Sequence, residues 1–326
     1  PGALKNLTSA KYYILIDPNV IVAKESVDGV VAAYLGISDK NELVFQSAAT
    51  APMPPKSGTF TYWSQFTDKE ASYDYSYDES WFLKSGTEYQ HDLARMSIRM
   101  AMAAARRTPV SIQNLFDQLG FSYSDASIDY PPPTKDSIGY AIGSKRILDE
   151  NGQEFTLVAV AVRGGGYKDE WASNFTIGKE AEHKGFKEAG EAVAEAVQSY
   201  ISEYGTGNTK VWITGYSRAA ATSNIAAQRL NEWSRQGNVK GLSTDGIYAY
   251  CFECPQNVRT TISKEYKNVY GNIHSIVNNI DIVTKVAPKD DNWNYSRYGI
   301  TYQIPTAGLI PIFSDKVTEM RAHYID

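Results

Sequence analysis

Several kinds of residue are scarce in this sequence, and each scarcity narrows the classes of protein to which it can belong. The chain has 326 residues but only two cysteines and four histidines. Its net charge is -5 and its lysines and arginines form no long cluster, so we expect no binding to nucleic acid. No apolar run approaches about 18 residues, which argues against a transmembrane helix.

The two cysteines lie close together, in the motif Cys251-Phe-Glu-Cys254-Pro255. A redox C-x-x-C motif opens a helix, where the helix dipole lowers a thiol pKa, whereas this motif ends an apolar run that resembles a strand. A zinc site would need two further ligands at matching spacing, and none is visible. We therefore prefer two packed thiols to a redox or metal site, and we expect no metal or organic cofactor.

The pattern of residues divides the chain near residue 58. Residues 1–58 contain two predicted strands, 12–16 and 42–46, around a predicted helix over 26–36. Three prolines within residues 52–55 then interrupt regular structure. We expect an N-terminal extension of unknown role over 1–58 and a main domain over 59–326.

The main domain begins with two predicted helices, 89–105 and 111–120. An apolar stripe on the first helix is rich in methionine and comprises Leu93, Met96, Ile98, Met100 and Met102. Such a stripe is typical of a buried core, although it could also line an acyl-binding site.

Strands and helices then alternate along the chain. A hairpin is predicted from strands 137–148 and 155–163, and further strands cover 210–216, 246–253, 272–283 and 299–304. Long helices are predicted over 180–204 and 218–233, with a closing helix at 314–325. This order predicts an α/β fold, with a mostly parallel sheet and helices on both faces.

The most informative motif is Gly215-Tyr-Ser217-Arg-Ala219, which joins a predicted strand to a predicted helix. A serine is activated when a sharp strand-to-helix turn presents it beside a base and backbone N–H donors. Small residues two positions before and after the serine let neighbouring backbone pass close by. The motif therefore predicts a nucleophile elbow, with Ala219 in place of the usual second glycine.

Two other strand ends supply candidate partners for Ser217. Arg163-Gly164-Gly165-Gly166 could expose backbone N–H groups to a ligand, cradle a phosphate or form a plain turn; the Lys-Ser/Thr pair of a phosphate loop is missing. Asp281 lies in the segment Asn279-Ile-Asp281-Ile-Val-Thr at the end of the predicted strand 272–283, where a carboxylate could orient an imidazole. Its competitors are Asp290, Asp291 and Asp315, whose surroundings indicate solvated side chains.

The few histidines limit the choice of a catalytic base. An α/β-hydrolase carries its triad in the order Ser, acid, His, so the base should follow Asp281. Among His91, His183, His274 and His323, only His323 does. His274 lies within a predicted strand and His183 at a helix start, where structural roles are expected.

Five motifs in order resemble the class 3 lipase family of α/β-hydrolases, especially the bacterial lipase-like proteins of Firmicutes. The similarity covers roughly residues 80–326. The motifs are the Arg163 glycine turn with Trp171-Ala-Ser-Asn174, His183-Lys-Gly-Phe186, the Ser217 elbow, the strand ending in Pro255, and Asn279-Ile-Asp281-Ile-Val.

The resemblance implies an α/β-hydrolase fold in which Ser217 is the nucleophile, Asp281 the acid and His323 the base. It also implies an oxyanion hole formed by the backbone N–H groups of Gly165 and Arg218. The chain departs from the family pattern at Ala219, Arg218 and Thr284, and the Arg218 cation beside the nucleophile would favour an anionic or polar substrate.

These observations predict a serine carboxylesterase or lipase that acts on a small-molecule ester or lipid through an acyl-enzyme. The segment 166–183, where the family has its lid, is short and polar, which favours smaller or more polar esters over an interfacial lipase. We expect a monomer with transient contact to a lipid surface. The 23 tyrosines are typical of a secreted or cell-surface protein, although no secretion signal is visible in this chain. The alternative is a catalytically silent binding or surface protein that keeps the fold.

Overall fold

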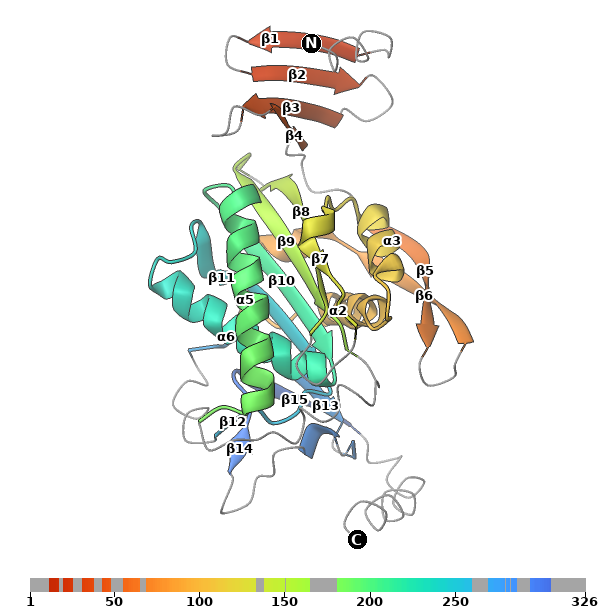
Figure 1. The fold of residues 1–326 in the computed structure, drawn as a ribbon, viewed down its shortest axis with the longest axis vertical. Helices are drawn as coiled ribbons and strands as arrows, with labels where there is room; N and C mark the ends of the chain where they lie inside the picture. Colours follow the sequence, from red (N-terminus) through yellow and green to blue (C-terminus); the bar gives the residue numbers. More distant parts are fainter. Residues whose placement is uncertain are drawn as a thin grey trace.

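The computed structural model describes most of the chain from residue 55 to residue 305, together with four short strands before it (Figure 1). The described residues are 12–17, 20–25, 31–37, 43–47, 55–64, 69–132, 138–149, 151–164, 181–259, 269–278, 280–281, 283–285 and 294–305. The predicted closing helix at 314–325, with His323, lies outside these ranges. Among the described helices, none is both long and apolar enough to cross a lipid bilayer.

A seven-stranded sheet forms the centre of the main domain, in the order β15-β13-β11-β10-β9-β8-β7. Its strands are β7 (Ile128–Asp129), β8 (Tyr140–Leu148), β9 (Glu154–Val162), β10 (Thr209–Tyr216), β11 (Leu242–Phe252), β13 (Ile273–Asn278) and β15 (Ile300–Ile304). The five strands from β9 to β15 run parallel, whereas β7 and β8 run antiparallel to their neighbours. The prediction of a mostly parallel sheet is confirmed.

Helices cover both faces of this sheet (Figure 1). One face packs against α5 (Lys184–Tyr204) and α6 (Arg218–Arg235), and the other against α2 (His91–Ala104) and α3 (Val110–Leu119). Because both faces are covered, β9 is buried from Phe155 to Val162, and Thr156 is the one polar residue in that stretch. With its crossover helices, this arrangement is the α/β-hydrolase fold.

The methionine-rich stripe of α2 belongs to the core, as predicted. Leu93, Met96 and Met100 are fully buried, while Ile98 and Met102 are partly buried against the same cluster. Ser97 on this helix accepts a hydrogen bond from the buried indole of Trp212 in β10, with 2.8 Å between Oγ and Nε1. The stripe and the Ser97 hydrogen bond therefore hold α2 against the sheet that contains β10, the strand before the elbow.

An antiparallel hairpin of β5 (Lys56–Ser64) and β6 (Lys69–Tyr77) was not predicted. Alternate residues of its strands face the α2 side of the core, where Phe60, Tyr62, Tyr75 and Tyr77 are buried. The alternation in Tyr73-Asp-Tyr-Ser-Tyr77 has the period of two that is typical of a half-buried strand. The sequence itself therefore indicates a strand at this position.

The predicted helix over 26–36 is wrong, because residues 31–37 form a strand. The N-terminal region contains a four-stranded antiparallel sheet of β1 (Tyr12–Asp17), β2 (Val20–Glu25), β3 (Val31–Ile37) and β4 (Leu43–Ser47). β3 pairs with β2 on one side and with β4 on the other. Two hydrogen-bonded neighbours outweigh the modest helix propensity of Val-Ala-Ala-Tyr-Leu.

The predicted strand 272–283 is shorter than expected and ends at Asn278. Two side chains accept local hydrogen bonds here and turn the backbone. Asn278 Oδ1 accepts from the Ile280 N–H at 3.1 Å, and Asp281 Oδ1 accepts from the Val283 N–H at 2.9 Å. A short 3₁₀ helix, η4 (Val283–Lys285), follows. Asp281 therefore lies on a turn beyond the strand.

Candidate active site at the nucleophile elbow

Ser217 occupies the turn between β10 and α6 and has a strained backbone. Its φ is 59° and its ψ is -126°, a region that residues other than glycine seldom adopt. Its N–H donates to the carbonyl oxygen of Phe252 at 2.9 Å, and its own carbonyl accepts from the Ala220 N–H, also at 2.9 Å. These two hydrogen bonds fix the serine between the end of β11 and the first turn of α6.

The small residues around Ser217 are required by close backbone contacts. A Cβ at Gly215 would lie 2.4 Å from the carbonyl oxygen of Ala219, so only glycine fits there. Ala219, which replaces the usual second glycine, is fully buried in the core cluster beneath α5 and α6. The turn therefore accommodates the additional methyl group.

The glycine turn after β9 lies against this elbow. A Cβ at Gly164 would come within 2.4 Å of the Tyr216 carbonyl oxygen, immediately before Ser217. The preceding Arg163 is buried, and its Nη1 donates to the Pro131 carbonyl at 2.8 Å. The structure thus brings the start of the glycine turn to the nucleophile, while the predicted oxyanion donor Gly165 lies just outside the described residues.

Arg218 is the first residue of α6, at the positive end of the helix dipole. Its backbone is therefore located where a developing negative charge on a substrate oxygen would be stabilised. Only 3% of the residue is exposed, and its side chain has contacts within the protein. The expected preference for an anionic or polar substrate, which rests on the Arg218 cation near the nucleophile, stays a prediction.

Asp281 lies at the same edge of the sheet as Ser217. Both follow parallel strands, β10 and β13, that flank β11, so their strand ends meet at one edge. The Asp281 carboxyl is partly buried, and this burial raises its pKa from the ordinary value. The competing acids Asp290, Asp291 and Asp315 lie outside the described residues.

A second carboxyl group at this edge, Glu253, was missed by the sequence analysis. It follows β11 directly, between the strands that lead to Ser217 and Asp281. Its carboxyl shares a hydrogen bond with that of Asp281, and burial together with the nearby Asp281 raises its pKa to about 7. Its position immediately after a parallel strand was the available signal, because ligands of such sheets bind beyond the strand ends.

Arg297 connects the loop of Glu253 to the turn of Asp281 through two hydrogen bonds. Its Nε donates to the carbonyl oxygen of Cys254 at 2.6 Å, and its Nη2 donates to that of Thr284 at 2.5 Å. One guanidinium therefore links the loop that carries Glu253 to the turn that carries Asp281. Desolvation lowers the Arg297 pKa without making the group neutral at physiological pH.

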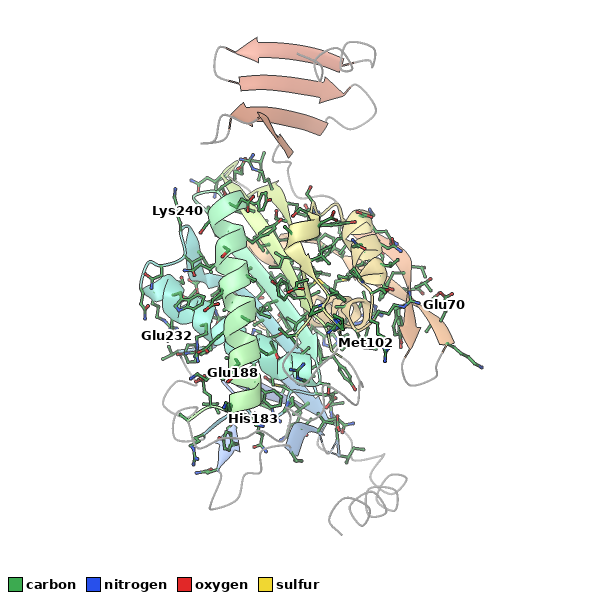
Figure 2. The ribbon with its side chains drawn as sticks, viewed as in Figure 1. Glu70, Met102, His183, Glu188, Glu232 and Lys240 are labelled. Atoms are coloured by element: carbon green, nitrogen blue, oxygen red, sulfur yellow. The ribbon has the colours of Figure 1, made fainter. Side chains whose placement is uncertain are left out.

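Two histidines have the structural settings that the sequence predicted. His274 is buried near the start of β13, with Nε2 3.0 Å from the Gly86 carbonyl oxygen and Nδ1 3.3 Å from the Tyr302 hydroxyl. His183 lies just before α5 (Figure 2). Its ring stacks on that of Phe186, with 4.1 Å between the centroids. His91, at the start of α2, is exposed.

Both cysteines are buried free thiols, which agrees with the preferred prediction of packed side chains. Burial raises the pKa of Cys254 to about 11 and that of Cys251 well above its usual range. A thiol of this kind is a poor nucleophile or redox group. In the part of the chain that the structure describes, no three His, Cys, Asp or Glu side chains are grouped to hold a metal ion.

A strained serine at a strand-to-helix turn, within this sheet order, defines an α/β-hydrolase. Residues 159–291 match the family model described as lipase (class 3). The matched segment contains all five of the ordered motifs on which the resemblance to class 3 lipases rests. The matched segment includes Ser217, Glu253 and Asp281, and it ends before His323.

Solved lipase structures resemble the chain at low sequence identity. A triacylglycerol lipase described as having a serine protease triad is 17% identical, with 67% of this chain and 82% of that chain covered and a TM-score of 0.47. The *Rhizomucor miehei* triacylglyceride lipase is 17% identical, with coverage of 67% and 82% and a TM-score of 0.44. For the lipase of *Rhizopus microsporus* var. *chinensis*, the identity is 14%, the coverage 66% and 76%, and the TM-score 0.42. None of the curated proteins matches the chain.

Proposed function

We propose that this protein is a serine hydrolase that cleaves carboxylic esters through an acyl-enzyme. The observation that carries the proposal is the backbone of Ser217, whose φ of 59° presents the side chain at the elbow beyond β10. Strain of this kind costs on the order of 1–3 kcal/mol and is characteristic of a nucleophile elbow. The fold and the class 3 lipase match support the same chemistry. They do not favour a catalytically silent binding protein.

In the proposed mechanism, His323 removes the proton of Ser217 as the hydroxyl attacks the ester carbonyl. Asp281 accepts a hydrogen bond from His323 and stabilises the imidazolium that forms. His323 then protonates the leaving alcohol, and a water molecule, activated by the same histidine, hydrolyses the acyl-enzyme. The position of Asp281 at the edge of the sheet beside the elbow supports its role. The role of His323 rests on its place in the sequence after Asp281.

The backbone N–H groups of Gly165 and Arg218 are proposed to hold the oxyanion. Support comes from the close approach of Gly164 to Tyr216, which carries the glycine turn to the elbow. Further support comes from the location of Arg218 at the first turn of α6. Two preorganised donors of this kind each contribute about 10²–10³-fold to the rate.

For the substrate, we propose a carboxylic ester that is smaller or more polar than a triacylglycerol. The short and polar segment 166–183 supports this choice. The burial of the α2 methionine stripe also supports a small substrate. Leu93, Met96 and Met100 pack in the core, so they do not line a site for a long acyl chain. A series of p-nitrophenyl esters of increasing acyl length should show the highest kcat/KM for short chains, whereas a maximum at long chains would favour a lipase.

The cellular setting belongs to the same proposal. We propose a monomer that acts outside the cell or at its surface, with transient contact to lipid, and that is related to bacterial lipase-like proteins of Firmicutes. We further propose that residues 1–58 form an extension to a hydrolase domain of residues 59–326. Size-exclusion chromatography with light scattering tests the monomer. Activity of a chain that lacks residues 1–54, a truncation that removes most of the extension and leaves strand β5 (Lys56–Ser64) whole, tests the division.

Labelling with a fluorophosphonate probe tests the nucleophile. We expect covalent labelling of the wild-type protein and loss of both labelling and p-nitrophenyl acetate turnover in Ser217→Ala. Ser202→Ala is a matched control, since Ser202 is exposed on α5 and should be dispensable. A wild-type protein with neither labelling nor turnover would contradict the proposal.

Two further variants test the acid and the base. Asp281→Asn and His323→Ala should each lower kcat by about 10²–10⁴-fold, as expected for a triad in which the members act together. His91→Ala is the control for the histidine, because His91 is exposed at the start of α2. Full activity in His323→Ala would place the base elsewhere.

A further inference from the structure

Glu253 has a backbone conformation that suits glycine better than glutamate. Its φ is 48°, in the left-handed region, although it is neither glycine nor asparagine. Its N–H donates to the carbonyl oxygen of Ile276 at 2.9 Å, which fixes the turn at the end of β11 against β13. A side chain held at such a position at a cost of about 1 kcal/mol or more indicates a role for that side chain.

The contacts of this side chain lead to Asp281. Oε2 of Glu253 accepts a hydrogen bond from the Asn278 N–H at 2.8 Å. The carbonyl oxygen of Asn278 in turn accepts from the Asp281 N–H at 3.1 Å, so one residue links the two acids through its backbone. The two carboxyl groups also hydrogen bond to each other directly.

A hydrogen bond between two carboxyl groups requires a proton, because two carboxylates have only acceptor oxygens and repel each other. Glu253 is better suited to carry the proton. Its Oε2 accepts from a neutral amide, and its environment is desolvated. Each carboxyl group accepts one backbone N–H. The hydrogen bond between the two groups raises the pKa of Glu253 and lowers that of Asp281, and aspartate also has the lower ordinary pKa.

The charged and titratable groups that face Glu253 are Asp281, Arg297, Cys254 and Tyr216. The described hydrogen bonds of the Arg297 guanidinium go to the carbonyl oxygens of Cys254 and Thr284. The Cys254 thiol and the Tyr216 hydroxyl have raised pKa values and are neutral near pH 7. Asp281 is therefore the group with which Glu253 shares its proton.

We propose that Glu253 is a positioning residue, which in its protonated form donates a hydrogen bond to Asp281 and holds that carboxylate in the orientation that the histidine requires. The inference rests on the proposed function of Asp281 as the acid of a triad. It adds a residue that the family resemblance does not imply. Burial and the neighbouring Asp281 raise the Glu253 pKa to about 7, so the proton is retained up to neutral pH.

The pH dependence of kcat for p-nitrophenyl acetate tests this role, with Glu253→Gln and Glu253→Gly compared to wild type. A glutamine can accept from Asn278 through its oxygen and donate to Asp281 through its amide at every pH. We expect Glu253→Gln to stay within about 3-fold of wild type at pH 6. Above pH 7, wild-type kcat should fall by about 10-fold as Glu253 ionises, and Glu253→Gln should not show this fall.

Glu253→Gly keeps the left-handed backbone and removes only the side chain, so it should fold. We expect its kcat to be at least 10-fold below wild type at pH 6, with little change in KM. Two results would overturn the role of Glu253. One is that kcat of Glu253→Gln falls above pH 7 as much as that of wild type. The other is that Glu253→Gly has the same kcat as wild type. Fluorophosphonate labelling of Ser217 in the wild-type protein distinguishes these results from failure of the hydrolase proposal. If the hydrolase proposal fails, the wild-type protein is not labelled.

Discussion

The Cα of Gly164 lies so close to the Tyr216 carbonyl oxygen that a Cβ on Gly164 would be 2.4 Å from it. Gly164 begins the glycine turn after β9, and Tyr216 is the last residue of β10 before Ser217. Two segments about 50 residues apart in the sequence are thus in backbone contact at the candidate site. The position of the glycine turn and the position of the nucleophile depend on each other.

Gly164→Ala should therefore disturb the elbow more than its single methyl suggests. The clash is with a carbonyl oxygen, and backbone cannot move aside as a flexible side chain can. We expect kcat for p-nitrophenyl acetate to fall by about 10²-fold, since a displacement of roughly 1 Å at an active site has effects of this size. The free energy of unfolding should drop by about 1–3 kcal/mol through local strain.

Gly207→Ala is the control for this substitution. A Cβ at Gly207 would meet no atom within 4 Å, and its backbone is not left-handed. Activity and urea unfolding should therefore match wild type. Equal activity in Gly164→Ala and Gly207→Ala would show that the glycine turn moves independently of the elbow.

Ala219→Gly tests whether the departure from the usual elbow pattern matters for activity. The Ala219 methyl is fully buried, and it would lie 3.5 Å from a Cβ on Gly164. Its removal costs the burial of one methyl and some helix propensity, about 1–2 kcal/mol of unfolding free energy in total. Because the backbone of Ser217 is unaffected, kcat should remain within about 3-fold of wild type. A change in kcat of more than 10-fold would show that the methyl shapes the site.

The elbow was predictable because local sequence determines it. A β-branched run, a glycine, a serine and an alanine-rich helix leave few alternatives for residues 211–220, and the structure has the expected strand, turn and helix. The helix over 26–36 was wrongly predicted for the opposite reason. Residues 31–37 have no strong local preference, and pairing with β2 and β4 decides their structure.

Glu253 could not be assigned to the candidate site from its sequence spacing alone, since its proximity to Ser217 and Asp281 depends on the order of the strands in the sheet. It lies 36 residues after Ser217 and 28 before Asp281 in the sequence, and adjacent strand ends bring the three loops to one edge. A left-handed backbone at a glutamate is also visible only in the structure.

A buried ion pair between Lys145 and Glu79 should be important for the stability of the domain. Lys145 on β8 contacts the Glu79 carboxylate, which is fully buried, and its Nζ also donates to the Leu119 carbonyl at 2.6 Å. Lys145→Met leaves the Glu79 charge without its partner in a desolvated position. We expect a loss of about 3–5 kcal/mol in unfolding free energy, measured by urea denaturation.

The double variant Lys145→Met with Glu79→Gln is the control for charge. It removes both charges, so much of the lost stability should return, by about 1–3 kcal/mol relative to Lys145→Met alone. If the double variant is no more stable than Lys145→Met, packing rather than the unpaired carboxylate accounts for the loss.

The raised pKa of Glu253 also predicts how its contribution to stability depends on pH. Burial and Asp281 raise the pKa of Glu253 from 4.5 to about 7 in the folded protein. The folded protein therefore binds the proton of this carboxyl group more tightly than the unfolded chain does. The stabilisation from this group is fully present below pH 4.5 and is lost as the pH rises to about 7. Glu253→Gln does not titrate, so its unfolding free energy relative to wild type should rise by on the order of 1–3 kcal/mol between pH 4.5 and pH 8. Urea denaturation of both proteins at these two pH values measures the difference. A constant difference would show that Glu253 has an ordinary pKa and shares no proton with Asp281.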